Sequence, residues 1–208
     1  GPEAFSEVRY LAHAKQMQAL ELIPQMAEQF KQIFGRDSGG LTHSYLVDDA
    51  ETIVVAMGSV LGTIKDTVDD MRSAGEKIGV LGITSYRPFP IESVRAALQN
   101  AQRVVVLEKS LAVGICGIVA TNVRLATPGI KLRGYTVIAG LGGRAITKTS
   151  LHKLFHQAEA DALEALTFLD LEWDIVNRVL EREKQQRRSG PIAEGILRDL
   201  GATGDKNV

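Results

Sequence analysis

The sequence predicts an α/β domain built on a parallel sheet, with helical extensions at both ends of the chain. Between residues 51 and 160, short apolar runs alternate with segments of helical periodicity. The apolar runs are continuous, which is typical of strands buried on both faces of a parallel sheet. Strand–helix repeats of this spacing predict three layers, with helices on each face of the sheet and right-handed connections.

Residues 1–50 are expected to form an N-terminal helix and a connecting loop. Apolar residues recur at helical spacing over 6–34, with Ser6 as a candidate N-cap. Pro24 is expected to kink or split this helix, because proline lacks an N–H and clashes with the preceding turn. Gly35 ends the helix, and a loop rich in glycine and serine follows to residue 45.

The central segment, residues 51–160, supplies the strands and helices of the predicted sheet domain. Strands are expected over 52–57, 77–84, 103–108 and 131–139. Helices are expected from residue 60 to Gly75, and over 91–98, 114–127 and 149–160. We expect Thr147 to cap the last of these helices.

Residues 161–208 are expected to form a C-terminal helical extension and tail. Leucine, tryptophan and valine side chains from Leu163 to Leu180 define an apolar stripe, which covers either a partner or the sheet edge. A charge run follows over 182–188, Gly190 and Pro191 break it, and residues 200–208 are expected to fray.

Composition excludes several classes of protein. The 24 Lys and Arg nearly balance the 25 Asp and Glu, so neither a nucleic-acid binder held by charge nor an acidic disordered chain is expected. No apolar run reaches the roughly 18 residues of a membrane span, and no signal peptide is visible, so we expect a cytoplasmic protein. The single cysteine, Cys116, excludes a disulfide framework, a Cys-rich zinc site and a chain-encoded iron–sulfur cluster.

Two glycine-containing turns are candidate sites at the carboxyl ends of strands, where parallel α/β sheets bind ligands. Gly58 and Ser59 form either an anion-binding helix start or a plain tight turn. Gly142 and Gly143 would let a ligand or partner approach the backbone, with Arg144 binding a carboxylate or phosphate. A structural loop with a buried salt bridge is an equal interpretation of this second turn.

Glu108 is the candidate carboxylate at the end of a central strand. Burying a carboxylate is costly without a partner, and Lys109, Arg87 or Arg144 would neutralise it. A structural ion pair is therefore favoured over a catalytic role.

Histidine, serine and cysteine residues give no catalytic or metal motif. His152 and His156 have the i, i+4 spacing of metal ligands, but no HExxH motif is present, so surface or interface histidines are expected rather than a metal site. Ser59 lies outside any GxSxG elbow, and Cys116 has no histidine nearby in the sequence. The residues alone therefore indicate an α/β domain without a complete active site.

Five segments in this order resemble one known family. They are Phe34–Arg36, Tyr45 with Asp48–Glu51, Met57–Ser59, Tyr86–Pro90 and Gly140–Arg144. Together they resemble core domain II of the alpha subunit of 2-oxoacid:ferredoxin oxidoreductases of the pyruvate synthase type. That domain is similar to the C-terminal domain of transketolase, and the resemblance covers about residues 5–160.

The resemblance implies part of an enzyme that oxidatively decarboxylates a 2-oxoacid, pyruvate or an aryl acid such as phenylglyoxylate, to an acyl-CoA. It implies thiamine diphosphate, Mg²⁺, iron–sulfur clusters and CoA in the complete enzyme, with none bound by this chain alone. The partners would be beta, gamma and delta type subunits, with ferredoxin or NAD as acceptor and no nucleic acid or membrane. The domain would serve subunit assembly and support the active site, and alone it should not catalyse.

The same resemblance makes Arg87, Pro88 and Phe89 interface or structural candidates, together with the glycine-turn residues, Arg144 and Glu108. The alternative is a free-standing α/β module that binds an anion or nucleotide, or that acts as a scaffold. A dissociation constant measured on the isolated chain would favour that alternative.

Overall fold

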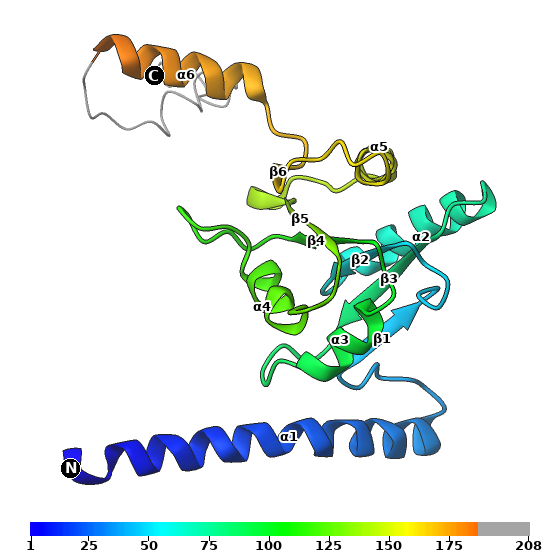
Figure 1. The fold of residues 1–208 in the computed structure, drawn as a ribbon, viewed down its shortest axis with the longest axis vertical. Coiled ribbons are helices and arrows are strands. Elements are labelled where there is room, and N and C mark those ends of the chain that lie inside the picture. The colour runs from blue at the N-terminus through cyan, green and yellow to red at the C-terminus, as the bar shows by residue number, and fades with distance from the viewer. Residues whose placement is uncertain (187–208) are drawn as a thin grey trace, which may run out of the picture. The chain divides into compact units, whose positions relative to one another are not determined.

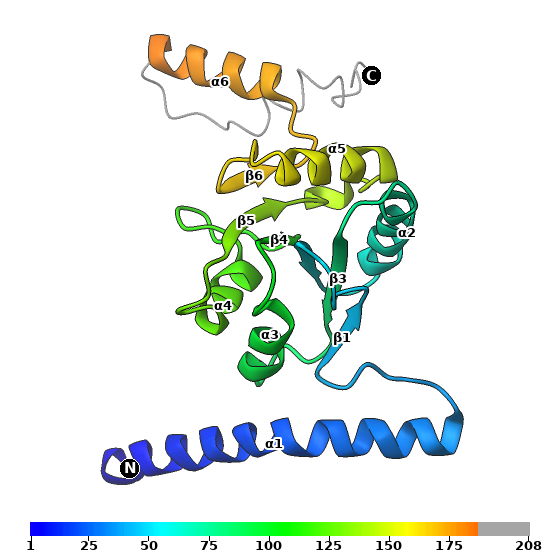
Figure 2. The same cartoon turned by 45° about the vertical axis from the view of Figure 1, so that its right-hand side comes forward.

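The computed structural model describes residues 1–186, whose central feature is a six-stranded sheet (Figures 1 and 2). The strand order is β1-β3-β2-β4-β5-β6, and only β1 runs antiparallel to its neighbour. The strands are β1 (Thr42–Tyr45), β2 (Thr52–Ala56), β3 (Ile78–Ile83), β4 (Arg103–Glu108), β5 (Arg133–Ile138) and β6 (Leu166–Phe168). The predicted α/β class with a mainly parallel sheet is confirmed.

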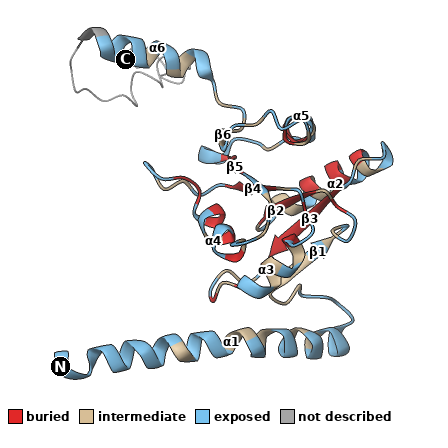
Figure 3. Cartoon of the chain, viewed as in Figure 1, coloured by how far each residue is buried: buried red, intermediate tan, exposed pale blue. Residues whose placement is uncertain are grey.

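Helices cover both faces of this sheet, as the continuous apolar runs predicted. Every residue of β2 and β3 is buried. Two helices, α2 (Val60–Ser73) and α5 (Lys148–Glu159), pack on one face, and α3 (Ile91–Leu98) and α4 (Ile118–Ala126) pack on the other. Figure 3 shows the buried residues concentrated in the strands and on the sheet-facing sides of these helices.

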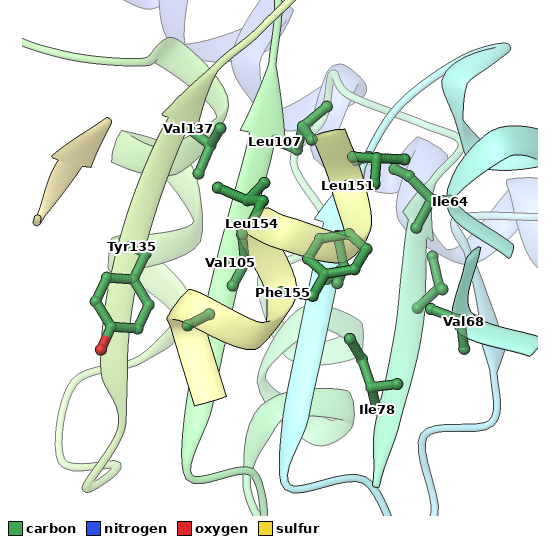
Figure 4. Close-up of a cluster of buried hydrophobic side chains, with 14 of the residues drawn as sticks. Ile64, Val68, Ile78, Val105, Leu107, Tyr135, Val137, Leu151, Leu154 and Phe155 are labelled. Carbon is green, nitrogen blue, oxygen red and sulfur yellow. The ribbon is translucent and has the colours of Figure 1, made fainter. Parts of the chain in front are cut away.

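The face covered by α2 and α5 carries the larger apolar cluster (Figure 4). Phe155 of α5 is fully buried and lies among side chains from β3, β4 and α2. Ile64, Val68, Leu151 and Leu154 are at most 1% exposed. Burying one such side chain contributes roughly 1.5–3 kcal/mol, so this cluster fixes α2 and α5 on the sheet.

The N-terminal segment forms a single helix, α1 (Phe5–Phe34), after a 3-10 turn over Pro2–Ala4. The expectation that Pro24 splits this helix is wrong, because Pro24 lies inside it. A proline removes one intrahelical hydrogen bond, whereas the turns before and after it retain theirs. Gly35 ends α1 as expected, with φ of 65° and its N–H donating to the Lys31 carbonyl at 2.8 Å.

Two strands were not expected from the sequence. β1 lies in the expected glycine-rich loop and pairs antiparallel with β3, placing His43 opposite Gly82. β6 lies in the expected C-terminal helical segment and pairs with the end of β5. Both are sheet-edge strands of four residues or fewer, too short to show a periodic pattern of their own.

The helix expected over 114–127 begins four residues later, at Ile118. A bridge between Ala112 and Cys116 folds the preceding residues into a turn, and Gly114 has a φ of 84°. Glycine adopts this left-handed conformation without steric cost, so Gly114 favours a turn over a helix start.

The chain divides into two units, the first ending at Leu169 and the second beginning at Asp170. The second unit contains α6 (Trp173–Gln186). The expected apolar stripe is interrupted by β6, and its members Leu163 and Leu169 pack against the α2–α5 cluster. The domain boundaries expected at residues 50 and 160 stay predictions. The break expected at residues 190–191 and the fraying expected over 200–208 fall outside the described residues.

No helix within residues 1–186 is both long enough and apolar enough to cross a bilayer.

Candidate functional site

A cavity of about 480 Å³ lies at the carboxyl ends of β2, β4 and β5. The chain leaves β2 toward β3 on one side and later returns to add β4 on the other side of β2. This reversal of strand order is a topological switch point, where the helices after neighbouring strands start on opposite faces of the sheet. Open α/β sheets bind ligands at this position, so the switch-point cavity is the leading candidate site.

The start of α2 forms one wall of the switch-point cavity. Gly58 and Ser59 line it, and Gly58 has a φ of 78°, which favours glycine at this turn. Ser59 occupies the N-cap position, where its hydroxyl makes no capping hydrogen bond, and the first turn of α2 carries no acidic residue. The positive end of the α2 dipole therefore borders the cavity without a carboxylate in the first turn of α2 to offset it.

Glu108 caps a helix from the end of β4. It is 6% exposed, and its Oε2 and Oε1 accept hydrogen bonds from the backbone N–H groups of Val119 and Ala120, each at 2.8 Å. These donors belong to the first turn of α4, so the carboxylate meets the positive end of that helix dipole. A Cβ added at Gly117 would overlap the same carboxylate, so only glycine fits there.

Basic and hydroxyl side chains complete the wall of the cavity. Lys109 and Ser110 follow Glu108 and are exposed, and Arg144 enters from the loop after β5. The lining residues include no histidine or cysteine, so the cavity offers neither a histidine base nor a cysteine nucleophile. The lining instead presents two cations and a helix start, an arrangement suited to an acidic or anionic group of a partner.

The structure brings together four of the candidate residues named from the sequence. Gly58, Ser59, Glu108 and Arg144 all line the switch-point cavity. Gly142 and Gly143 belong to the same loop as Arg144, in a short 3-10 turn, but do not line the cavity. The ion pair expected for Glu108, with Lys109, Arg87 or Arg144, stays a prediction. The capping of α4 by Glu108 was not expected from the sequence.

The other three candidates lie in the loop between β3 and α3. The Arg87 guanidinium carbon lies 4.0 Å from the centroid of the Tyr86 ring, and the Phe89 ring meets that ring edge-on at 6.0 Å. The Tyr86 hydroxyl accepts a hydrogen bond from Asn122 of α4 at 2.9 Å, and Pro88 is buried. This loop therefore packs against α4, and none of its residues lines the switch-point cavity.

Sequence reasoning did not single out some of the lining residues. Ser110 lies two residues after Glu108, so the rule that sites gather at strand ends was sufficient to find it. Thr63 lies one turn inside α2, and Ile146 precedes α5, so placing them requires the packed structure.

Comparisons with known proteins match the family that the sequence motifs resemble. The family described as "Pyruvate:ferredoxin oxidoreductase core domain II" matches residues 50–151. The pyruvate synthase subunit PorA of Methanosarcina barkeri is 40% identical over 184 residues, covering 84% of this chain and 45% of the relative. The alpha subunit of the NADH-dependent phenylglyoxylate dehydrogenase of Aromatoleum evansii is 32% identical, covering 77% of this chain and 39% of the relative.

Among solved structures, a split-gene transketolase has a TM-score of 0.43 at 17% identity, covering 56% of this chain and 40% of that one. The chain spans less than half the length of the two curated relatives named above. Residues 50–151 contain the sheet from β2 to β5, both walls of the switch-point cavity and the start of α5. Residues 50–151 belong to the pyruvate:ferredoxin oxidoreductase core domain II family, and most of the chain is similar to subunits of 2-oxoacid oxidoreductases.

Proposed function

We propose that this chain is part of the alpha subunit of an oxidoreductase that converts a 2-oxoacid to an acyl-CoA. In that reaction the bond between the carbonyl and carboxylate carbons breaks and CO₂ leaves. The acyl group passes to the CoA thiol, and two electrons pass to ferredoxin or NAD. The similarity to a pyruvate synthase subunit, at 40% identity over most of this chain, carries the proposal.

Pyruvate is the proposed substrate, because the pyruvate synthase subunit is more similar to this chain than the phenylglyoxylate enzyme is. An aryl 2-oxoacid is the second candidate. Substrate contacts are proposed to come mainly from segments beyond this chain, since the chain spans less than half the length of these relatives.

The iron–sulfur clusters do not fit this chain. A cluster is held by about four cysteine thiolates, and the sequence has only Cys116. That residue is buried, with its Sγ 3.4 Å from both Thr121 Oγ1 and Arg124 Nη1. We propose that other chains of the complex hold the clusters.

The Mg²⁺ that accompanies thiamine diphosphate does not fit the switch-point cavity either. Mg²⁺ is held by carboxylates, and both oxygens of Glu108, the one carboxylate among the lining residues, already accept backbone hydrogen bonds. We propose that these groups and CoA bind to other parts of the complete enzyme, with this domain supporting their site.

The proposed role of the domain is assembly through the sheet edge that carries the cavity. The loop after β4 exposes Val113 and Ile115, which are 89% and 75% exposed, and the loop after β5 exposes Leu141. Apolar side chains beside the cations of the cavity make a surface typical of a subunit contact. We therefore propose that another subunit or domain of the enzyme covers this edge.

The test is reconstitution of the complete enzyme from its subunits. The double variant Val113→Asp/Ile115→Asp should abolish assembly and CoA-dependent dye reduction with pyruvate, while the isolated chain keeps its melting temperature. Leu125→Asp, at an exposed leucine of α4, is the matched control and should assemble normally. Arg144→Ala should weaken assembly more than it weakens the isolated fold.

Normal assembly of the double variant would overturn the proposed interface. Substrate choice is measured separately. Faster dye reduction with phenylglyoxylate than with pyruvate would favour an aryl 2-oxoacid over pyruvate as the substrate. Binding of a nucleotide by the isolated chain, together with failure to join any subunit, would favour the free-standing module.

A further inference from the structure

A second cluster of titratable side chains lies near the amino ends of the strands, away from the switch-point cavity. Glu76 lies between α2 and β3, two residues before that strand begins. His156 and Glu159 lie in the last turns of α5, which packs beside α2. The cluster therefore joins two elements that are 80 residues apart in the sequence.

The three side chains present their polar atoms to one another at metal-ligand spacing. His156 Nδ1 lies 3.6 Å from Glu76 Oε2 and 3.9 Å from Glu159 Oε2. One ligand atom from each residue lies within 4.8 Å of the other two. Tetrahedral zinc bonds of about 2.0–2.1 Å place ligand atoms roughly 3.4 Å apart, so the two histidine–carboxylate distances need shorten only slightly.

The cluster also contains a polar atom that the fold leaves without a hydrogen bond. Within residues 1–186, Glu76 Oε2 is buried without a hydrogen-bond donor, since 3.6 Å to the His156 imidazole is too long for a hydrogen bond. Burial of a carboxylate oxygen without a hydrogen bond is costly, and a bound cation would remove that cost.

The two carboxylates of the cluster repel each other when both are charged. The side chains of Glu76 and Glu159 are 22% and 26% exposed, so solvent only partly screens this repulsion. A divalent cation would offset both negative charges.

The neighbouring histidine belongs to a different contact. His152 Nε2 lies 3.3 Å from the Asp70 carboxylate of α2, which also pairs with Lys148. The His152 and His156 rings stack at 6.3 Å between centroids. The i, i+4 spacing of the two histidines therefore gives a stacked pair, and only His156 faces the two glutamates.

We propose that Glu76, His156 and Glu159 bind one divalent cation of the zinc type, with water completing the coordination. Imidazole and carboxylate ligands suit Zn²⁺ and Co²⁺, whereas Mg²⁺ and Ca²⁺ prefer all-oxygen sites. The cation would fasten the end of α5 to the turn before β3. Its role would be structural, because the cluster lies away from the switch-point cavity.

The experiment titrates the full, tag-free chain with ZnCl₂ at pH 6.5 in a calorimeter, with CoCl₂ absorption as a spectroscopic check. One Zn²⁺ per chain is expected. Free Zn²⁺ at a hundred times its Kd should raise Tm by about 5 °C or more. The same concentration of Mg²⁺ should leave Tm unchanged.

Three variants decide whether this cluster holds the cation. His156→Gln and Glu159→Gln should each weaken Zn²⁺ binding at least tenfold, whereas His152→Gln, one turn earlier on α5, should bind as the unchanged chain does. Because Glu159→Gln also removes the carboxylate repulsion, its metal-free Tm should not fall. Absence of Zn²⁺ binding, or binding that survives both ligand variants, would overturn the proposal.

Discussion

The cap formed by Glu108 on α4 gives the sharpest test of the energetics of this fold. Substitution Glu108→Gln keeps the length and shape of the side chain but removes its charge. A glutamine offers one acceptor oxygen where two backbone N–H groups, of Val119 and Ala120, now each donate at 2.8 Å. Its amide NH₂ would face the second of these donors, so one buried N–H loses its hydrogen bond.

The size of the effect follows from these contacts. Hydrogen bonds to charged groups contribute about 1.5–3 kcal/mol each, and a buried donor left unpaired costs about 1–3 kcal/mol. Loss of the charge at the start of α4 costs up to about 2 kcal/mol more in a partly buried site. These costs overlap, so we expect the free energy of unfolding to fall by about 2–4 kcal/mol for Glu108→Gln.

Urea unfolding of the isolated chain at pH 7 measures this loss, with unfolding followed by circular dichroism. Glu92→Gln is the matched control, because Glu92 is an exposed acid in the first turn of α3 and should change stability by less than about 0.5 kcal/mol. A loss below about 1 kcal/mol for Glu108→Gln would refute the capping role. The Glu108 carboxylate would then contribute little to the stability of the isolated fold.

Three further outcomes follow from buried contacts. Gly117→Ala should destabilise by about 2–4 kcal/mol, because its Cβ overlaps the Glu108 carboxylate, and in a double-mutant cycle its cost should fall well short of additive with Glu108→Gln. Phe155→Ala should cost about 3–5 kcal/mol by thermal unfolding, whereas Leu125→Ala, at a 60% exposed side chain, should stay within about 0.5 kcal/mol. Because burial raises the pKa of Glu159 to about 7 from 4.5, the native state holds this proton longer than the unfolded chain, so stability should fall as pH rises from 4.5 to 7. Solvent screening limits that fall to about 1–2 kcal/mol, Glu159→Gln should remove it, and a pH profile unchanged by the substitution would contradict this reasoning.

The core strands could be predicted because their amino-acid composition reflects burial on both faces of the sheet. A run such as Val104–Leu107 is apolar at every position, and only a strand covered on both faces buries such a run. β1 and β6 were missed because each is an edge strand whose pairing is set by a distant neighbour. His43 lies opposite Gly82, for example, and nothing local to either residue indicates that contact.

The candidate site was predictable to the extent that it depends on strand ends. Gly58, Glu108 and Arg144 follow three different strands, and parallel pairing brings those ends to one edge of the sheet. The glutamate–histidine cluster could not be found in this way. Glu76 and His156 are 80 residues apart, and they meet only because α2 and α5 pack on the same face.

The role of Glu108 also determines the charge that the switch-point cavity presents to a partner. A free carboxylate there would cancel one of the two cations, Lys109 and Arg144, that line the same space. Because both of its oxygens accept hydrogen bonds from the first turn of α4, the helix dipole offsets its negative charge locally. The capped Glu108 carboxylate therefore offsets the charge of Lys109 less than a free carboxylate would, and the surface that meets the cavity is expected to be acidic. Lys109→Ala should consequently make assembly less sensitive to salt, whereas Glu92→Ala should leave its salt dependence unchanged.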